Sequence, residues 1–216
     1  MSTFSPWRLW LIRQVFHLLY NQLAWTYDAV ASVVSQGQWK LWGGAALPYL
    51  RGPRVLDLGH GPGNLLPVLA QAGFDAVGYD LSPYMGRIAR RRLARRGLRI
   101  PLARGLAQGL PFSDGVFHSV VCTFPSEFIV HPATLSEIGR VLAAGGVLVL
   151  VPMAFLTGGG PLTRLLLWLY AITGQRPPDE ASPPPHFEPA GFHSDVKWVS
   201  LPRSRVMVIV NEKRAA

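Results

Sequence analysis

The sequence predicts one α/β domain built on a doubly wound, mainly parallel sheet. Three observations lead to this prediction. Apolar, strand-like runs alternate with helical segments across residues 54–152, which is the pattern of successive β-α-β units. The first run ends in a glycine turn that passes directly into a helix. The chain has 216 residues, 49% of them hydrophobic, so it can bury the core that such a sheet requires.

The segment before the sheet predicts a helical cap over residues 1–50. Ser5 and Pro6 are typical of a helix start, with serine as the N-cap and proline at the first helical position. Apolar side chains then recur at helical spacing from residue 7 to about residue 31. A shorter helical segment, residues 39–50, leads to Gly52-Pro53 and the first strand.

The central part, residues 51–152, predicts five parallel strands with helices between them. Asn64 is predicted to cap the first of these helices, and Gly73 and Gly97 are expected to end the first two. Val55, Leu56 and Leu58 of the first strand are apolar, which favours burial on both faces of the sheet. The expected strands are residues 54–58, 75–80, 100–104, 116–123 and 147–152, and the expected helices are residues 64–72, 83–96 and 134–141.

The last third of the chain departs from this alternation. Residues 162–172 predict a strongly apolar helix, and residues 175–188 are proline-rich and predict irregular structure. Two β-rich runs, residues 196–201 and 206–210, flank the turn residues 202–205 and predict a hairpin. The expected layout is a single domain with a cap (1–50), a sheet core (51–152), an insertion (153–192) and an antiparallel C-terminal hairpin (193–216).

Composition narrows the function classes. The single cysteine, Cys122, rules out a disulfide within the chain and a zinc site of several thiolates, and it favours a reducing, cytoplasmic setting. The apolar stretch at residues 9–19 is short and contains Arg13, so neither a transmembrane helix nor a signal peptide is predicted. The net charge of +9 either favours an anionic neighbour or reflects only the arginine-rich composition of the source genome.

The glycine turn predicts a site for a nucleotide-type cofactor. Gly59, Gly61 and Gly63 stand at alternate positions, and glycine permits both positive φ angles and close approach of the backbone to a ligand. The helix that follows offers free N–H groups at its N-terminus. Asp57 adds an acceptor beside the turn. In a parallel sheet this turn lies at the carboxyl ends of the strands, where such cofactors bind.

Residues 54–152 resemble the class I S-adenosylmethionine-dependent methyltransferases. The glycine turn is joined by Asp80 at the end of the second strand, by the Leu81–Met85 segment, and by the Arg140–Gly146 approach to the fifth strand. The glycine spacing and the C-terminal hairpin differ from those expected of a nicotinamide enzyme. The resemblance implies a Rossmann-like seven-stranded sheet and a methyltransferase that uses S-adenosylmethionine and releases S-adenosylhomocysteine.

The resemblance also implies which residues hold the cofactor. Asp80 would accept hydrogen bonds from the ribose hydroxyls, and Met85 or Leu81 would contact the adenine. The implied cofactor-binding set is Asp57, Gly59, His60, Gly61, Gly63, Asn64, Asp80, Leu81, Met85, Leu106, Ala107, Thr123 and Phe124.

Two positions depart from the family pattern. Leu106 stands where these enzymes commonly carry an aspartate for the adenine amino group, so backbone groups near Leu106 and Ala107, or the Gln108 side chain, would hold the adenine instead. His118 replaces a second usual aspartate. These departures keep open a different hypothesis, a module that binds S-adenosylmethionine without turnover.

The methyl acceptor is predicted to be small and apolar or lipid-like. The apolar segments 7–31 and 162–172 correspond to parts that cover the acceptor pocket in the enzymes that this chain resembles, although simple cap packing is the alternative. Tyr20, Tyr27 and Trp168 are predicted on the acceptor side, and Glu127 and His131 are candidate catalytic bases. The histidines are too scattered to predict a metal site. Peripheral contact with the inner face of an anionic membrane is a further prediction.

Seven arginines lie on or just after the predicted helix 83–96: Arg87, Arg90, Arg91, Arg92, Arg95, Arg96 and Arg99. One interpretation is an anion-binding face for lipid or RNA, and the other is a solvated outer helix. No aromatic residues are interleaved with the arginines, which is unfavourable to RNA binding. Nucleic acid is therefore not the predicted partner, and an RNA methyltransferase is kept as the alternative function.

Overall fold

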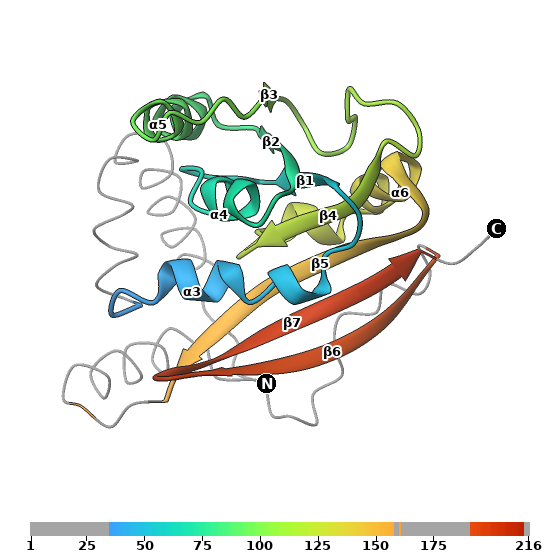
Figure 1. Ribbon diagram of the computed structural model, residues 1–216. Coiled ribbons are helices and arrows are strands. Elements are labelled where there is room, and N and C mark those ends of the chain that lie inside the picture. Colours follow the sequence, from blue (N-terminus) through green and yellow to red (C-terminus); the bar gives the residue numbers. More distant parts are fainter. Residues whose placement is uncertain (1–34, 158–159, 161–190, 214–216) are drawn as a thin grey trace, which may run out of the picture.

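A seven-stranded mixed sheet organises the computed structural model, which describes residues 35–157, 160 and 191–213 (Figure 1). The strand order is β3-β2-β1-β4-β5-β7-β6. The first five strands run parallel, whereas β7 is antiparallel to β5 and β6 is antiparallel to β7. The predicted fold class is thereby confirmed. The strands are β1 (Arg54–Leu58), β2 (Asp75–Asp80), β3 (Leu102–Arg104), β4 (Phe117–Thr123), β5 (Leu142–Leu156), β6 (Phe192–Leu201) and β7 (Ser204–Lys213).

Helices cover both faces of the sheet, so each strand contributes to two cores. On one face, alternate residues such as Val55 and Val121 pack with Trp42 and Leu69 from the helices before and after β1. On the other face, residues such as Leu56 and Val120 pack with Ile138. The helical elements are α3 (Trp39–Gly44), η1 (Leu47–Tyr49), α4 (Leu66–Gln71), α5 (Pro83–Ala94), η2 (Glu127–Val130) and α6 (Pro132–Val141).

Helix α4 begins later than predicted, and Asn64 does not cap it. The N-cap position is Leu65, without a side-chain hydrogen bond. The side-chain oxygen of Asn64 instead accepts a hydrogen bond from the Arg92 guanidinium, which also donates to the Pro62 carbonyl at 2.8 Å. The prediction was wrong because a cation from α5, 28 residues along the chain, takes the oxygen that a local cap would have used.

The strands β5, β6 and β7 are longer than predicted. Strand β5 begins at Leu142 rather than at residue 147, and residues 143–146 form an irregularity in its pairing with β4, where the register shifts between Phe117 and Ser119. The hairpin turn comprises only Pro202 and Arg203, because Leu201 already pairs with Ser204. Strand β3 begins at Leu102 rather than at residue 100. The boundaries expected at 152 and 193 therefore fall inside or beside strands.

A buried polar network fixes α3 to the start of β7. The indole N–H of Trp42 donates to the Ser204 hydroxyl at 2.8 Å, and that hydroxyl donates to the side-chain oxygen of Gln38 at 2.9 Å. Trp42 is 3% exposed, so these bonds are shielded from water. The short helix is thus held against the sheet although it is more than 160 residues from β7 in sequence.

Several predicted features lie outside the described residues. These are the helix expected over residues 7–31, the helix expected over residues 162–172, and the acceptor-side residues Tyr20, Tyr27 and Trp168. Within the described part of the chain, no helix is both long enough and apolar enough to cross a membrane.

Candidate functional site: a cofactor cavity at the strand ends

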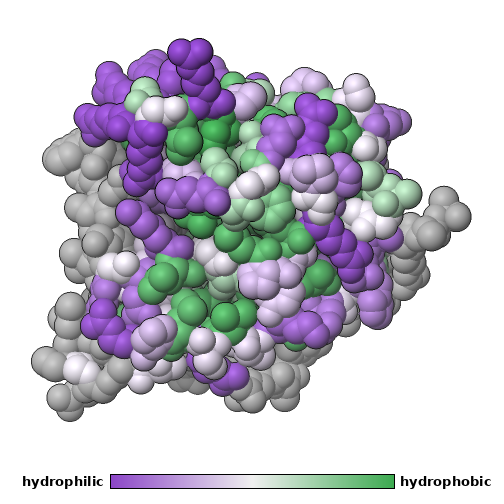
Figure 2. Space-filling view, viewed as in Figure 1, coloured by the Kyte–Doolittle hydropathy of each residue, from purple (hydrophilic) through white to green (hydrophobic). Residues whose placement is uncertain are grey.

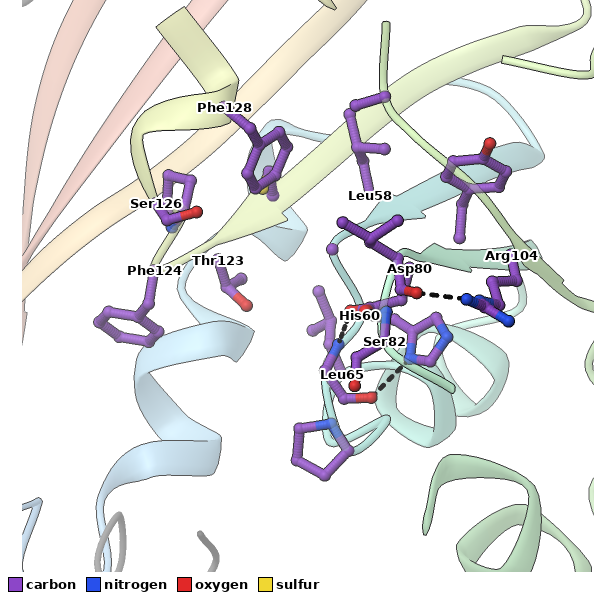
Figure 3. Close-up of a pocket in the computed structure, with 18 of the residues that line it drawn as sticks. Leu58, His60, Leu65, Asp80, Ser82, Arg104, Thr123, Phe124, Ser126 and Phe128 are labelled. Carbon is purple, nitrogen blue, oxygen red and sulfur yellow. Dashed lines mark hydrogen bonds between the residues drawn. The ribbon is translucent and has the colours of Figure 1, made fainter. Parts of the chain in front are cut away.

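A cavity of about 890 Å³ opens at the carboxyl ends of β1, β2 and β4 (Figure 3). This is the edge at which parallel sheets of this kind bind their ligands. The glycine turn after β1, the end of β2, the segment after β3 and the end of β4 all contribute to its wall. The volume is near the upper end of the range of about 300–1,000 Å³ that is typical of small-molecule sites.

The three turn glycines have positive φ angles but different surroundings. Gly61 has a φ of +53°, and no atom lies within 4 Å of the place where a Cβ would stand. At Gly63, with a φ of +72°, a Cβ would lie 2.8 Å from the Cβ of Ala89 in α5. Gly61 therefore leaves open space over the cavity, whereas Gly63 allows close packing of α5 and does not line the cavity.

The substitutions Gly61→Ala and Gly63→Ala form a matched pair, because both place a Cβ on left-handed backbone. We expect Gly63→Ala to be the less stable variant by about 1–3 kcal/mol, because only it overpacks against Ala89. Gly61→Ala is expected to stay folded and to lose affinity for S-adenosylhomocysteine. Thermal unfolding and calorimetric titration measure the two effects, and equal stability of the variants would contradict the packing assignment.

Asp80 closes the glycine turn onto the end of β2. One carboxylate oxygen accepts a hydrogen bond from the Gly61 N–H at 2.8 Å, and the other accepts from the Ser82 N–H at 2.7 Å. Ser82 in turn caps α5 by accepting from the Met85 N–H at 3.3 Å. The carboxylate also lines the cavity, so its remaining lone pairs are accessible from that space. Asp80 thus shapes the turn and is available to a ribose at the same time.

Asp57, although predicted at the site, is buried beneath it. The residue is 1% exposed, is not part of the cavity wall, and neither carboxylate oxygen has a hydrogen-bond partner among the described residues. Burial raises the pKa of Asp57 from 3.8 to about 8, and the nearby Asp80 charge adds to this effect. The side chain is therefore largely protonated at neutral pH and does not act as a fixed anion there.

His60 and Cys122 lie on the cavity wall as neutral groups. The Nδ1–H of His60 donates to the Gly61 carbonyl at 2.6 Å, and burial lowers the pKa of this imidazole. Burial raises the pKa of the Cys122 thiol well above its ordinary value. The nearby carboxylates of Asp57 and Asp80 raise this pKa further. A thiol in this condition is a poor nucleophile.

The segments after β2 and β3 form one end of the cavity. Leu81 and Leu106 are 55% and 59% exposed and line this end, together with Ala107 and Gln108. Met85 is fully buried and does not line the cavity, because its position in α5 points it into the core. Of the two alternatives for the adenine contact, the structure therefore brings only Leu81 to the cavity.

Neither candidate base reaches the cavity wall. The imidazole of His131 accepts a hydrogen bond from the Ala133 N–H at 3.2 Å and so caps α6. Glu127 begins η2 and is exposed outside the cavity. The structure therefore places neither Glu127 nor His131 among the residues that line the cavity.

Aromatic residues line the cavity near the end of β4, and only some of them were predicted from the sequence. Thr123 and Phe124, both predicted, line the cavity, as does Asn64. Trp39 and Phe128 also line it and were missed, as were Leu65, Ser82 and Arg104. Figure 3 shows Phe124 and Phe128 on one side of the cavity and Asp80 and Arg104 on the other. No sequence signal links Trp39 to Phe124, because 85 residues separate them in the chain.

The site fits S-adenosylmethionine. The open space above Gly61 admits a ligand against bare backbone, and the Asp80 carboxylate faces that space. Residues 55–146 match the family model described as a methyltransferase domain. The sheet order and the glycine turn agree with this match, so residues 55–146 form a domain of the methyltransferase type.

The chain is also similar to individual proteins. It is 36% identical over 139 residues to demethylmenaquinone methyltransferase of Thermus thermophilus, covering 62% of this chain and 63% of that protein. It is 37% identical over 137 residues to the protein of that name from Symbiobacterium thermophilum, covering 59% and 55%. The matches thus span less than two thirds of these relatives. A SAM-dependent methyltransferase structure from Aquifex aeolicus shares the fold, with a TM-score of 0.57, 17% identity, and coverage of 82% and 93%.

Proposed function

We propose that this chain transfers the methyl group of S-adenosylmethionine to a small, lipid-like acceptor of the quinol type. The observation that carries the proposal is a single cavity with two unlike ends, one polar around Asp80 and one aromatic around Phe124. The name of the relatives, demethylmenaquinone methyltransferase, supports an acceptor of this chemical class.

The residues at the polar end bind and orient rather than react. When bound, S-adenosylmethionine supplies a methyl group on a positively charged sulfur. That methyl group would pass to an electron-rich oxygen or ring carbon of the quinol, and the electron pair of the broken carbon–sulfur bond would stay on sulfur. The proton that the quinol loses would leave to solvent, because neither Glu127 nor His131 lines the cavity. In this proposal Asp80 holds the ribose, Gly61 leaves room for the methionine part, and Leu81 and Leu106 flank the adenine. Catalysis then comes from in-line positioning and exclusion of water.

The proposal is tested by following label from S-adenosylmethionine that carries tritium in its methyl group. The intact chain is incubated separately with a short-chain 1,4-naphthoquinol, a lipid extract, small amines and transfer RNA. We expect label in the solvent-extracted quinol. Label in RNA would instead favour the alternative of an RNA methyltransferase. Tight binding of S-adenosylhomocysteine without transfer to any acceptor would favour a binding module without turnover.

We further propose that helix α5 holds the protein at an anionic membrane, where an apolar acceptor would reside. The arginines of α5 other than Arg92, and those of the segment after it, are exposed, and α5 contains no acidic residue. Hydrophilic side chains gather over α5 in Figure 2. Exposed Leu81, Tyr84 and Leu106 lie beside this basic surface, on or near the rim of the cavity. Basic and apolar groups together are typical of surfaces that bind at a lipid interface.

Replacing Arg90 and Arg91 by glutamine should weaken binding to phosphatidylglycerol vesicles. Each arginine near such a surface contributes about 1 kcal/mol, so we expect a loss of roughly 30-fold, measured by cosedimentation. The control makes the same change in net charge elsewhere: Lys40 on α3 and Arg203 in the hairpin turn are both replaced by glutamine. This control variant should bind the vesicles like wild type. Equal losses in the two variants would mean that only net charge matters, and binding to RNA but not to vesicles would contradict the membrane proposal.

A further inference from the structure

The aromatic end of the cavity is built around a strained residue. Phe124 has a φ of +51°, a backbone conformation that residues other than glycine rarely adopt. Its N–H donates to the Val151 carbonyl at 2.7 Å, next to the last pair of the β4–β5 ladder, Thr123 and Val151. The ladder therefore holds this backbone in place. Strained residues of this kind cluster at functional sites, where the conformation aims a side chain.

The ring of Phe124 is stacked on Trp39. The two ring centroids are 4.3 Å apart, and the ring planes are inclined by 27°. Behind them Trp42 lies 6.0 Å from Phe124 and is fixed by its hydrogen bond to Ser204. The Phe124–Trp39 wall is thus supported from β5 on one side and from β7 on the other. Such a wall presents an apolar surface whose geometry is set before any ligand binds.

Hydroxyl groups border this wall. Thr123 and Ser126 line the same part of the cavity, and neither hydroxyl has a hydrogen-bond partner among the described residues. The neighbouring groups Leu65, Pro125 and Phe128 are apolar. A ligand that suits this end has a flat apolar face for the rings and oxygen atoms at its edge for the hydroxyls.

We propose that the Phe124–Trp39 wall is the acceptor subsite and that it takes a planar ring with oxygen substituents. The inference rests on the proposed function and adds the residues that select the acceptor. It reassigns Phe124, expected from sequence to bind the cofactor, to the acceptor. The cofactor's polar groups are served by Asp80 and the glycine turn at the other end of the cavity, which leaves the aromatic end for a second ligand.

The test compares two probes on the full chain saturated with S-adenosylhomocysteine. The planar probe is 1-naphthol, and the control is its saturated analogue decahydro-1-naphthol. We expect wild type to bind 1-naphthol more tightly. Phe124→Leu and Trp39→Leu should each weaken 1-naphthol binding by roughly 3- to 10-fold, which corresponds to the loss of one aromatic contact. Phe155→Leu, which removes an aromatic ring of β5 beside Trp198 and away from the cavity, should bind like wild type.

The affinity for S-adenosylhomocysteine shows whether the Phe124–Trp39 wall binds the acceptor or the cofactor. The proposal requires that Phe124→Leu and Trp39→Leu keep this affinity within about twofold of wild type, because their rings contact the acceptor only. A parallel loss of S-adenosylhomocysteine affinity would assign the wall to the cofactor and overturn the proposal. Equal binding of the planar and saturated probes would overturn the planar-ring class. Neither result depends on methyl transfer by wild type, which tests the proposed function separately.

Discussion

Replacing Asp80 by alanine is expected to lower the affinity for S-adenosylhomocysteine by about 100-fold or more. The carboxylate accepts from the N–H groups of Gly61 and Ser82, at 2.8 and 2.7 Å, and faces the cavity. Hydrogen bonds to a charged group contribute about 1.5–3 kcal/mol each, so losing the ribose contacts alone predicts a change of this size. The release of the glycine turn adds to it. Isothermal titration calorimetry measures the affinity directly.

Asp75→Ala is the matched control for this experiment. Asp75 begins the same strand that Asp80 ends, and it makes an exposed ion pair with Arg54 at 3.5 Å. Exposed pairs contribute about 1 kcal/mol or less, so this variant should fold and bind within about twofold of wild type. Asp80→Asn keeps one acceptor oxygen and should lie between wild type and Asp80→Ala. Wild-type affinity in Asp80→Ala would remove Asp80 from the site.

The second large effect concerns Asp57 and the pH dependence of stability. Its folded-state pKa is raised from 3.8 to about 8. Between these values the folded protein keeps a proton that the unfolded chain has lost. The free energy of unfolding therefore falls as pH rises through this window, by up to about 1.4 kcal/mol per pH unit from this group alone. The stability that Asp57 contributes is complete below its pKa in the unfolded chain. It is lost as the pH rises toward its pKa in the folded protein.

Asp57→Asn should remove this slope. The amide matches the protonated carboxyl in size and does not ionise, so the variant should gain stability relative to wild type as pH increases from 4 toward 8. Chemical denaturation at a series of pH values gives the difference between the two proteins, in which the contributions of all other groups cancel. Parallel stability curves would show that Asp57 ionises as freely in the folded protein as in the unfolded chain.

The features predictable from sequence are those that depend on neighbours along the chain. The apolar run before Gly59 predicts a strand buried on both faces, and Val55 and Leu56 indeed enter opposite cores. The end of β2 at Asp80 was predicted to the residue. A local pattern suffices in these cases because periodicity and turn chemistry are themselves local.

The errors occur where a distant residue competes for the same group. Asn64 was predicted as a helix cap, but Arg92 takes its oxygen. Met85 was one of two alternatives for the adenine, and packing of α5 buries it. For Asn64 and Met85, tertiary contacts decided between two chemically reasonable uses of one side chain.

The fold class and the glycine turn could be predicted from the sequence, because the apolar period, the glycine spacing and Asp80 all lie within short segments. The burial of Asp57 as a neutral acid and the stacking of Trp39 on Phe124 depend instead on how the chain folds in three dimensions. The physical reason is that desolvation and ring stacking depend on which surfaces the sheet brings together. Trp39 reaches Phe124 because α3 is fixed to Ser204 at the far end of the chain.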